Sequence, residues 1–170
     1  MNNSKHLGPN LRPRVALFEP RIPQNTGTIG RSCLAFNLSL DIIKPTGFSF
    51  QDKYLKRAGL DYWSNVDVQL YESFQEYKNQ FNKCRIIALT KKSKNSISNI
   101  NYKKTDILLF GREDNGLPAN IISQCDVIAG IPMPGGESQL KSGGVRSLNL
   151  SVACGIVCYS ACHQLDLLTN

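Results

Sequence analysis

Three short segments of this chain combine glycines with charged and amide side chains that could take part in chemistry. They are Asn25–Arg31, Phe110–Pro118, and the pair formed by Ile131–Met133 and Arg146–Ser151. The first two come shortly after apolar runs and lead into segments with a helical pattern. Glycines at such bends let backbone groups approach a small molecule closely. The order and composition of the three segments therefore predict one ligand site.

Residue types that these segments lack narrow the chemistry. The two histidines of the chain, His6 and His163, lie outside all three segments, so a mechanism based on histidine is not expected. No C-x-x-C pair and no zinc-ligand spacing occurs, so we expect no metal. Neither the G-x-G-x-x-G fingerprint of dinucleotide-binding domains nor a phosphate-binding loop ending in Gly-Lys-Ser/Thr is present. A dehydrogenase or a nucleotide hydrolase is therefore a weak alternative.

Size and charge set further limits. The chain has 170 residues, 41% of them hydrophobic, which is enough for one domain with a buried core. Its 20 Lys and Arg against 13 Asp and Glu give a net charge of +7, which suits a polyanionic partner. We expect residues 1–13 to form a basic, mobile tail and residues 14–170 to form a single domain. Without a membrane-spanning apolar run or a secretory signal, the cytoplasm is the expected compartment.

Apolar runs that alternate with longer mixed segments indicate the fold class. Several runs are continuously apolar, as expected for parallel strands covered on both faces, so the pattern predicts an α/β fold with a mainly parallel sheet flanked by helices. The three segments follow strands, and open parallel sheets bind ligands beyond the carboxyl ends of their strands. The predicted strands are 15–18, 40–43, 66–70, 85–89, 106–110 and 127–131, and the predicted helices are 26–36, 52–58, 72–81, 118–124 and 147–164.

Taken together, the three segments resemble the motifs of the SPOUT methyltransferases. The stretch Leu17–Gly27 is similar to the opening of the TrmL (YibK-type) enzymes, and the resemblance runs from about Val15 to the C-terminal helix. It implies a C-terminal deep trefoil knot, which general folding rules would not predict. It also implies 2′-O-methylation of tRNA nucleotide 34, a cytidine or modified uridine of leucine tRNAs, with S-adenosylmethionine as the cofactor. The partner would then be a tRNA anticodon loop.

The resemblance also names the residues of the cofactor pocket. Methyl transfer to a hydroxyl is an in-line displacement, so the site must hold two reactants in line, exclude water and help to remove a proton. Gly111 is the most specific signal, because it separates an apolar strand from two charges. For Leu89 and Ile131 the role of ordinary core residues at strand ends stays open. The implied contacts are Leu89, Gly111, Ile131 and Ser147, with Met133 and Leu148 as apolar walls.

By the same resemblance, the catalytic group is Arg31, Asn25, Glu113 and Asn149. A base role for an arginine is chemically difficult because arginine side chains have pKa values above about 12. We therefore expect Arg31 to position the target nucleotide and to stabilise negative charge on its oxygen. Asn25 is expected to cap the first helix, and Glu113 to accept hydrogen bonds from Arg31 or from backbone donors. For Asn25, Glu113 and Asn149, structural support and direct substrate contact are both possible.

The family works as a homodimer whose first and last helices pack across the interface, and the resemblance implies the same here. Cys154, Cys158 and Cys162 recur every four residues, so they share one packed apolar face of the last helix, which fits such a contact. RNA contacts are expected from basic side chains that grip phosphates and from aromatic rings that stack on bases. The candidates are Lys53, Lys56 and Arg57 near Tyr62 and Trp63, and the loop lysines Lys91, Lys92, Lys94, Lys103 and Lys104.

One segment departs from the family pattern. Between Met133 and Arg146 the chain is longer than usual, by the glycine-rich stretch around Gly136–Gly143, and the sequence does not assign a role to the loop Gly135–Gly144. Two alternative functions are left open. One is 2′-O-methylation of a different tRNA or rRNA ribose, and the other is a non-catalytic RNA-binding module of the same fold.

Overall fold

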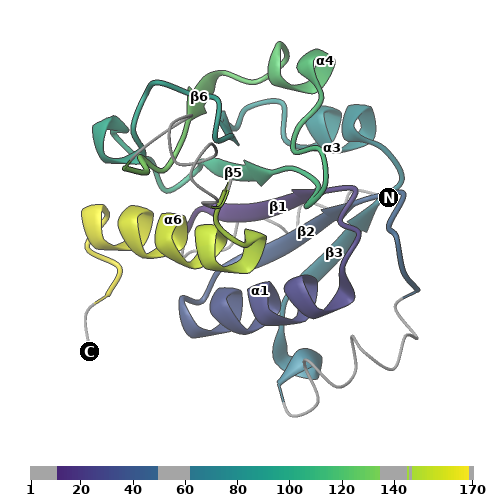
Figure 1. The fold of residues 1–170 in the computed structure, drawn as a ribbon. Coiled ribbons are helices and arrows are strands. Elements are labelled where there is room, and N and C mark those ends of the chain that lie inside the picture. Colours follow the sequence, from purple (N-terminus) through teal and green to yellow (C-terminus); the bar gives the residue numbers. More distant parts are fainter. Residues whose placement is uncertain (1–10, 50–61, 135–144, 146, 169–170) are drawn as a thin grey trace.

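A parallel sheet forms the centre of the molecule (Figure 1). The computed structural model describes residues 11–49, 62–134, 145 and 147–168. Six strands run in the order β3-β2-β1-β5-β4-β6, and every neighbouring pair is parallel. The predicted parallel α/β architecture is therefore confirmed. The strands are β1 (Arg14–Phe18), β2 (Ser39–Ile43), β3 (Val68–Tyr71), β4 (Ile86–Leu89), β5 (Ile107–Phe110) and β6 (Val127–Ala129).

Helices cover both faces of this sheet (Figure 1). On one face, α1 (Pro23–Ala35) and α6 (Leu150–Gln164) pack against each other, and on the other lie α3 (Phe74–Gln80) and α4 (Ala119–Ile122). Two short 3₁₀ helices, η1 (Trp63–Asn65) and η2 (Ile97–Asn99), lie in connections between strands. No helix among the described residues is both long enough and apolar enough to cross a bilayer.

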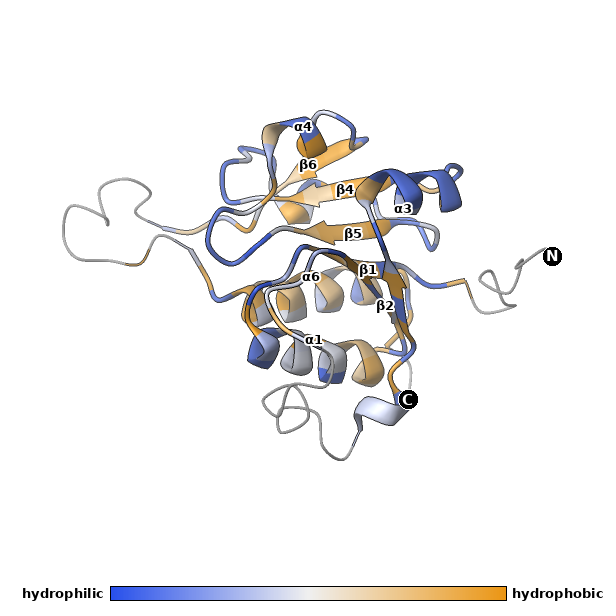
Figure 2. Ribbon diagram, turned by 90° about the vertical axis from the view of Figure 1, so that its right-hand side faces the viewer, coloured by the Kyte–Doolittle hydropathy of each residue, from blue (hydrophilic) through white to orange (hydrophobic). Residues whose placement is uncertain are grey.

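Alternation along the strands explains the two hydrophobic cores. Val15 and Leu17 of β1 belong to the core beneath α1 and α6, whereas Ala16 and Phe18 belong to the core beneath α3 and α4. Successive side chains of a strand point to opposite faces, and here both faces are covered. The strands β4, β5 and β6 therefore read as continuous apolar runs, and β4 and β5 carry hydrophobic colours in Figure 2.

A buried charged group sits within the second core. Asp41 of β2 is completely buried and accepts hydrogen bonds from Arg14 Nε at 2.7 Å and Nη2 at 2.6 Å, and from the Tyr77 hydroxyl at 2.8 Å. The Arg14 guanidinium also lies over the Phe81 ring, 4.8 Å from its centroid. Burial lowers the pKa of Arg14, but the hydrogen bond and charge of Asp41 raise it further, so the net shift is upward. The guanidinium therefore stays protonated.

The cysteine face of α6 is part of the first core. Cys154, Cys158 and Cys162 are fully buried together with Cys33 of α1. Burial raises the pKa of Cys33 well above its ordinary value and that of Cys162 to about 11, so these thiols are unreactive at neutral pH. The expectation that this face contacts a second subunit is wrong, because it packs against the sheet of its own chain.

Several element boundaries differ from the prediction for local reasons. Helix α1 begins at Pro23 rather than Thr26, since proline suits the first helical turn, where no N–H is needed. Strand β6 ends at Ala129 because Gly130 bridges to Ser96 instead. Other elements are shorter than predicted: β3 begins at 68, α3 spans 74–80, α4 spans 119–122 and α6 begins at 150.

Some predictions fall outside the described residues. These are the helix over 52–58, the contacts of Lys53, Lys56 and Arg57, the loop Gly135–Gly144 and residues 1–10 of the predicted tail. At the described end of that tail, Arg12 donates a hydrogen bond from Nη1 to the Phe36 carbonyl at 3.2 Å. Residues 11–13 are the described part of the tail, and Arg12 links them to the residue that follows α1.

Candidate active site

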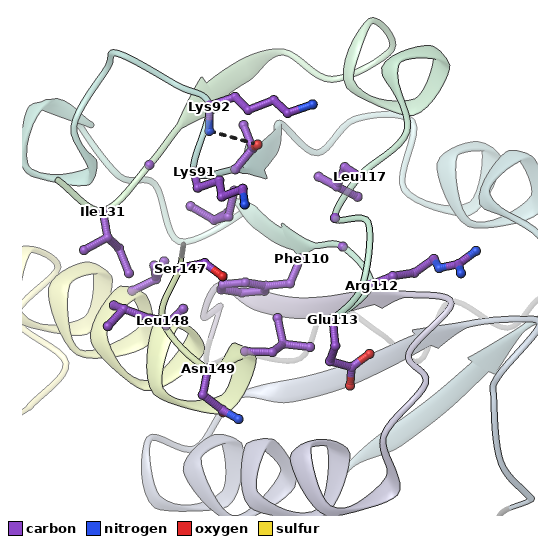
Figure 3. A pocket seen from close by; sticks show the side chains of 18 of the residues that line it. Lys91, Lys92, Phe110, Arg112, Glu113, Leu117, Ile131, Ser147, Leu148 and Asn149 are labelled. Carbon is purple, nitrogen blue, oxygen red and sulfur yellow. Dashed lines mark hydrogen bonds between the residues drawn. The ribbon is translucent and has the colours of Figure 1, made fainter. Parts of the chain in front are cut away.

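A pocket of about 1010 Å³ opens at the carboxyl ends of β5, β4 and β6, in the half of the sheet that ends in the edge strand β6. It is walled by the ends of β4, β5 and β6, the start of α1 and the first turns of α6, so segments far apart in the sequence meet there (Figure 3). All three of the segments that the sequence singles out contribute residues. The predicted single site at this edge of the sheet is a real cavity. Its volume lies at the upper end of the range for small-molecule sites.

All six residues expected to bind the cofactor line this pocket: Leu89, Gly111, Ile131, Met133, Ser147 and Leu148. Leu89 and Ile131 are half-buried and also pack against the core beneath α1 and α6. They therefore line the pocket and pack against the core at the same time. Figure 3 shows Ile131, Ser147 and Leu148 close together on the side of the pocket nearest α6.

Gly111 is needed by the loop that it begins. A Cβ atom at this position would lie 2.2 Å from the Gly116 carbonyl carbon and 2.3 Å from the Leu117 nitrogen. Arg112 and Gly116 exchange backbone hydrogen bonds of 3.2 and 2.9 Å, and Gly116 has a positive φ of 68°. This tight turn carries the Glu113 side chain back toward α1. The glycine therefore shapes the loop itself, whatever close approach it also offers to a ligand.

Glu113, Asn25 and Asn149 form one hydrogen-bonded chain that joins the three segments. The Asn25 amide nitrogen donates to Glu113 Oε1 at 3.2 Å, and its oxygen accepts from Asn149 Nδ2 at 3.0 Å. Asn149 is itself held, because its oxygen accepts from the backbone N–H and the hydroxyl of Ser151 at 2.8 and 2.7 Å. All three side chains line the pocket, and these bonds set their orientation. The geometry favours structural support as their main role.

Glu113, rather than Asn25, accepts the hydrogen bonds at the start of α1. The cap position of α1 is Ile22, and Asn25 lies inside the helix with its side chain turned to the pocket, so the prediction that Asn25 caps the helix is wrong. Instead, Glu113 accepts from the backbone N–H groups of Arg21 at 2.8 Å and Ile22 at 3.1 Å. A carboxylate at the start of a helix is favoured by the helix dipole. The expectation of backbone donors for Glu113 is confirmed.

The acidic and basic side chains beside Glu113 form ion pairs with one another. Arg112 binds Asp114 through two hydrogen bonds of 2.9 and 2.6 Å and lies 3.6 Å from Glu19. The hydrogen bond from Arg112 lowers the pKa of Asp114 to about 2. Lys91 and Lys92 lie on the opposite side of the pocket from Glu113 (Figure 3), and neither has an acidic partner within the described part of the chain. Positive charge is therefore available at that rim.

Arg31 is the one predicted site residue that the structure does not bring to the pocket. It is exposed on α1, and its guanidinium lies over the Tyr62 ring, 5.5 Å from the centroid. Asn25 and Arg31 are six positions apart, which separates them by about 9 Å along the helix and turns them to different sides. The expected hydrogen bond from Arg31 to Glu113 is absent from the described contacts, because Glu113 bonds to Arg21, Ile22 and Asn25 instead.

Sequence reasoning missed several apolar parts of the pocket. Phe110, Leu117, Ala153 and Val157 all line it. Phe110 and Leu117 lie within the segment Phe110–Pro118, where they were not singled out, and Ala153 and Val157 lie on the inner side of α6. Nothing in their residue types separates them from ordinary core residues, so no signal in a single sequence could have found them. Among the described residues, no three or more His, Cys, Asp or Glu side chains gather as a metal site.

The fold and the pocket define a class: a parallel α/β protein whose ligand pocket is built by three segments at the carboxyl edge of the sheet. The model of the SpoU rRNA Methylase family matches residues 12–159, and the chain belongs to this family. The chain is 40% identical over 156 residues to the tRNA (cytidine(34)-2′-O)-methyltransferase of Yersinia pestis, which covers 89% of this chain and 93% of the relative.

Solved structures extend the similarity to three dimensions. A structure described as giving structural insights into the 2-OH methylation of C/U34 on tRNA matches with a TM-score of 0.84 and 37% identity, covering 92% of this chain and 98% of the other. The AdoMet-bound rRNA methyltransferase from Sinorhizobium meliloti matches with a TM-score of 0.76 and 25% identity, covering 91% of this chain but 57% of the other. The chain thus corresponds to nearly all of the first protein and to one part of the second.

Proposed function

We propose that this protein transfers a methyl group from S-adenosylmethionine to the ribose 2′-oxygen of tRNA nucleotide 34. The observation that carries the proposal is the correspondence over 98% of a structure described for 2-OH methylation of C/U34, at a TM-score of 0.84. The similarity to a named cytidine-34 enzyme over 93% of its length supports the same substrate position. Leucine tRNAs are the proposed substrates, and the cytoplasm the proposed compartment.

The pocket suits S-adenosylmethionine in size and in the character of its walls. Its volume of about 1010 Å³ can hold the whole cofactor, and Leu89, Ile131 and Leu148 offer apolar surface for the adenine. Ser147 and the backbone at the bends after β4, β5 and β6 offer polar groups for the ribose and the methionine part. Once bound, the cofactor would supply an electrophilic methyl group on a sulfonium.

The residues of this chain would orient the reactants rather than form a bond to them. In the reaction the 2′-oxygen forms a bond to the methyl carbon, the carbon–sulfur bond breaks with its electron pair going to sulfur, and the hydroxyl proton leaves to solvent or to a nearby acceptor. Glu113 holds Asn25, and Asn149 holds Asn25 from the other side, so the pocket wall beside α1 keeps its shape. Such fixed positioning is worth a large share of the rate in a two-reactant step.

We also propose a homodimer in which α1 and α6 of the two subunits face each other. The face of α6 that is turned away from its own core exposes three large apolar side chains, Val152 (50%), Ile156 (38%) and Tyr159 (54%). Arg31 lies exposed on α1, the helix beside α6, and does not reach the pocket of its own chain. In this dimer Arg31 would act at the pocket of the partner subunit, where it would position the nucleotide and stabilise charge on its oxygen.

Mixed dimers test this arrangement. Arg31→Ala and Glu113→Ala subunits with different affinity tags would each form a homodimer with strongly reduced turnover. If Arg31 acts across the interface, the mixed dimer regains one complete site, with Glu113 from one subunit and Arg31 from the other. A mixed dimer no faster than the two homodimers, or a chain that stays monomeric at micromolar concentration by light scattering, would contradict the proposal.

Binding of tRNA is supported by charge. The net charge of +7 suits a phosphate backbone that passes the site on its way to the reacting ribose. So do Lys91 and Lys92 at the pocket rim, which have no acidic partner among the described residues. We propose that the anticodon loop lies over this rim. Affinity for tRNA should then fall steeply between 50 and 200 mM salt, with a smaller salt dependence in a Lys91→Ala, Lys92→Ala double variant.

The proposed deep trefoil knot is supported by how the last part of the chain is held. The connection after β4 bonds to the segment that follows β6, with Gly130 N–H donating to the Asn95 carbonyl at 2.9 Å. Helix α6 then lies beside η2, and Gln164 donates to the Ile100 carbonyl at 2.8 Å and accepts from Tyr102 N–H at 2.6 Å. A crystal structure tests the knot through the path of its backbone. A path that could be drawn into a straight line by pulling its two ends would contradict the knot.

The direct test of function is methyl transfer from labelled S-adenosylmethionine to total tRNA, with the product nucleotide mapped by nuclease digestion and mass spectrometry. We expect a 2′-O-methyl group at nucleotide 34 of leucine tRNA, formed about 100-fold more slowly with Glu113→Ala. Methylation of a different tRNA or rRNA ribose would keep the chemistry and overturn the substrate. Cofactor binding by calorimetry without transfer to any RNA would favour a non-catalytic module.

A further inference from the structure

The segment that contains η1 is bound closely to the surface of α1 next to Arg31. The Tyr62 hydroxyl donates to the Gly27 carbonyl of α1 at 3.2 Å. The neighbouring Trp63 ring contacts the helix at Gly30, where a Cβ atom would be 2.5 Å from the ring carbon Cζ3. Both aromatic side chains are half-buried and pack against the core beneath α1 and α6. Two successive aromatic residues thus fix this segment to one helix.

Glycine at position 30 is best explained by this contact. Glycine inside a helix lowers the stability of the helix relative to alanine. Here the missing side chain lets the Trp63 ring reach the helix backbone, which any larger residue would prevent. Because Gly30 precedes Arg31, the ring is anchored immediately beside the base of the arginine side chain.

The Tyr62 ring contacts the Arg31 side chain. Its guanidinium carbon lies 5.5 Å from the centroid of the Tyr62 ring, within the range of a cation–π contact. Among the residues that the structure describes, Arg31 has no acidic partner. A long exposed arginine otherwise samples many rotamers. The Tyr62 ring therefore limits the directions in which this guanidinium can point.

We infer that Tyr62 is a positioning residue for the reaction, which acts by holding Arg31 in the orientation required at the active site, with Trp63 as its anchor on α1. The inference rests on the role of Arg31 in the proposed methyl transfer. The sequence also suggested that Tyr62 and Trp63 stack on RNA bases. Tyr62 already contacts Arg31, and Trp63 already contacts α1 at Gly30, so the structure favours a supporting role over contact with RNA.

A matched pair of variants separates the ring from the hydroxyl. Tyr62→Phe keeps the ring and loses the bond to Gly27, whereas Tyr62→Leu removes the ring. We expect Tyr62→Leu to lower kcat about three- to tenfold, as for loss of a partly exposed cation–π contact together with some orientation. The KM for tRNA and the affinity for S-adenosylmethionine should stay within about twofold. Tyr62→Phe should restore most of kcat.

An Arg31→Ala background shows whether Tyr62 acts through Arg31. Under single-turnover conditions, adding Tyr62→Leu to Arg31→Ala should produce no further loss. An equal loss in both backgrounds, or a rise in the KM for tRNA at unchanged kcat, would overturn the inference, the latter in favour of base stacking. Unchanged kcat in Tyr62→Leu would also overturn it, and the proposed function would stand if Arg31→Ala still turned over far more slowly than the natural protein.

A spectroscopic measurement keeps the test independent of activity and of variant folding. In the full-length protein, the Arg31 Nε–H proton should show a ring-current shift that Tyr62→Phe preserves and Tyr62→Leu abolishes. An unshifted proton in the natural protein would overturn the inference directly. If no RNA is methylated at all, the proposed function fails, whereas the shift still reports whether the contact exists.

Discussion

The Arg14–Asp41–Tyr77 group and the Glu113–Asn25–Asn149 group each consist of three hydrogen-bonded polar side chains, but their surroundings differ. The first lies in the core between β1, β2 and α3, where Asp41 and Tyr77 are completely buried. The second lies beyond the carboxyl ends of the strands and lines the pocket, where Glu113 is half-buried and Asn149 exposed.

This difference shows how one chemistry serves two purposes. The buried group does not line the pocket and contributes to stability and to the specificity of packing. The pocket group ties together residues 25, 113 and 149, which are up to 124 positions apart, and faces open space. We therefore expect substitutions in the first group to change folding, and substitutions in the second to change catalysis more than folding.

The largest effect on stability is expected at Asp41. Asp41→Ala would leave the Arg14 guanidinium buried without its partner, which lowers the free energy of unfolding by about 3–5 kcal/mol. Urea unfolding followed by circular dichroism measures this loss. Replacing the whole group with Arg14→Met, Asp41→Leu and Tyr77→Phe should recover most of it, because no buried charge remains. A loss below about 1 kcal/mol in Asp41→Ala would show that the Arg14 guanidinium is hydrated in the variant.

The opposite pattern is expected at Glu113. Glu113→Ala removes the acceptor of the Arg21 and Ile22 N–H groups and of the Asn25 amide. The start of α1 then loses its fixed position beside the pocket, and we expect kcat for tRNA methylation to fall about 100-fold. Glu113→Gln keeps one acceptor oxygen and should fall less. Turnover within threefold of normal in Glu113→Ala would remove the contrast between the two groups.

Asn149 allows the two purposes to be separated within one residue. It caps α6 through its oxygen and supports Asn25 through its nitrogen. Asn149→Asp keeps the cap, so its unfolding free energy should change by less than about 0.5 kcal/mol, whereas Asn149→Ala should lose about 1 kcal/mol. Turnover should fall in both, because both lose the donor to Asn25. Normal turnover in Asn149→Asp would show that this donor has no role.

The smallest effect is expected at low pH, in the Arg112–Asp114 pair at the edge of the pocket. The hydrogen bond from Arg112 lowers the pKa of Asp114 to about 2, below its unfolded value of about 3.9. Because the folded pKa is depressed, the contribution of this pair is present above about pH 4 and is lost as the pH falls toward 2. The Asn115 amide, which donates to Asp114, should titrate by NMR near pH 2 and lose this transition in Asp114→Asn.

Much of the fold could be predicted because parallel strands leave a local signal. Runs such as Ile107–Phe110 are apolar throughout since both faces are covered, and the strand positions follow directly. Boundaries were less accurate where a long-range contact decides them. Strand β6 ends where Gly130 pairs with Ser96, and the position of such a partner cannot be inferred from local sequence.

The candidate site was predictable where residue type and position in a segment carry the signal. Gly111 stands out because it directly follows an apolar run, and the resemblance to SPOUT enzymes implies that Gly111 and Ser147 share one cofactor pocket, which both of them line. Leu117 and Val157 line the same pocket but could not be distinguished from core residues. Burial beside a cavity and burial within a core demand the same apolar side chain.

By itself, the sequence determined the class of the sheet, the three segments that meet at its carboxyl edge, and the residue types that the pocket needs. These depend on local pattern and on the common direction of parallel strands. Only the tertiary structure decided that Glu113 rather than Asn25 serves the start of α1, that the cysteine face of α6 belongs to the core, and that Arg31 lies away from its own pocket. Each depends on which side of a helix meets a distant segment, and packing of the whole chain sets that choice.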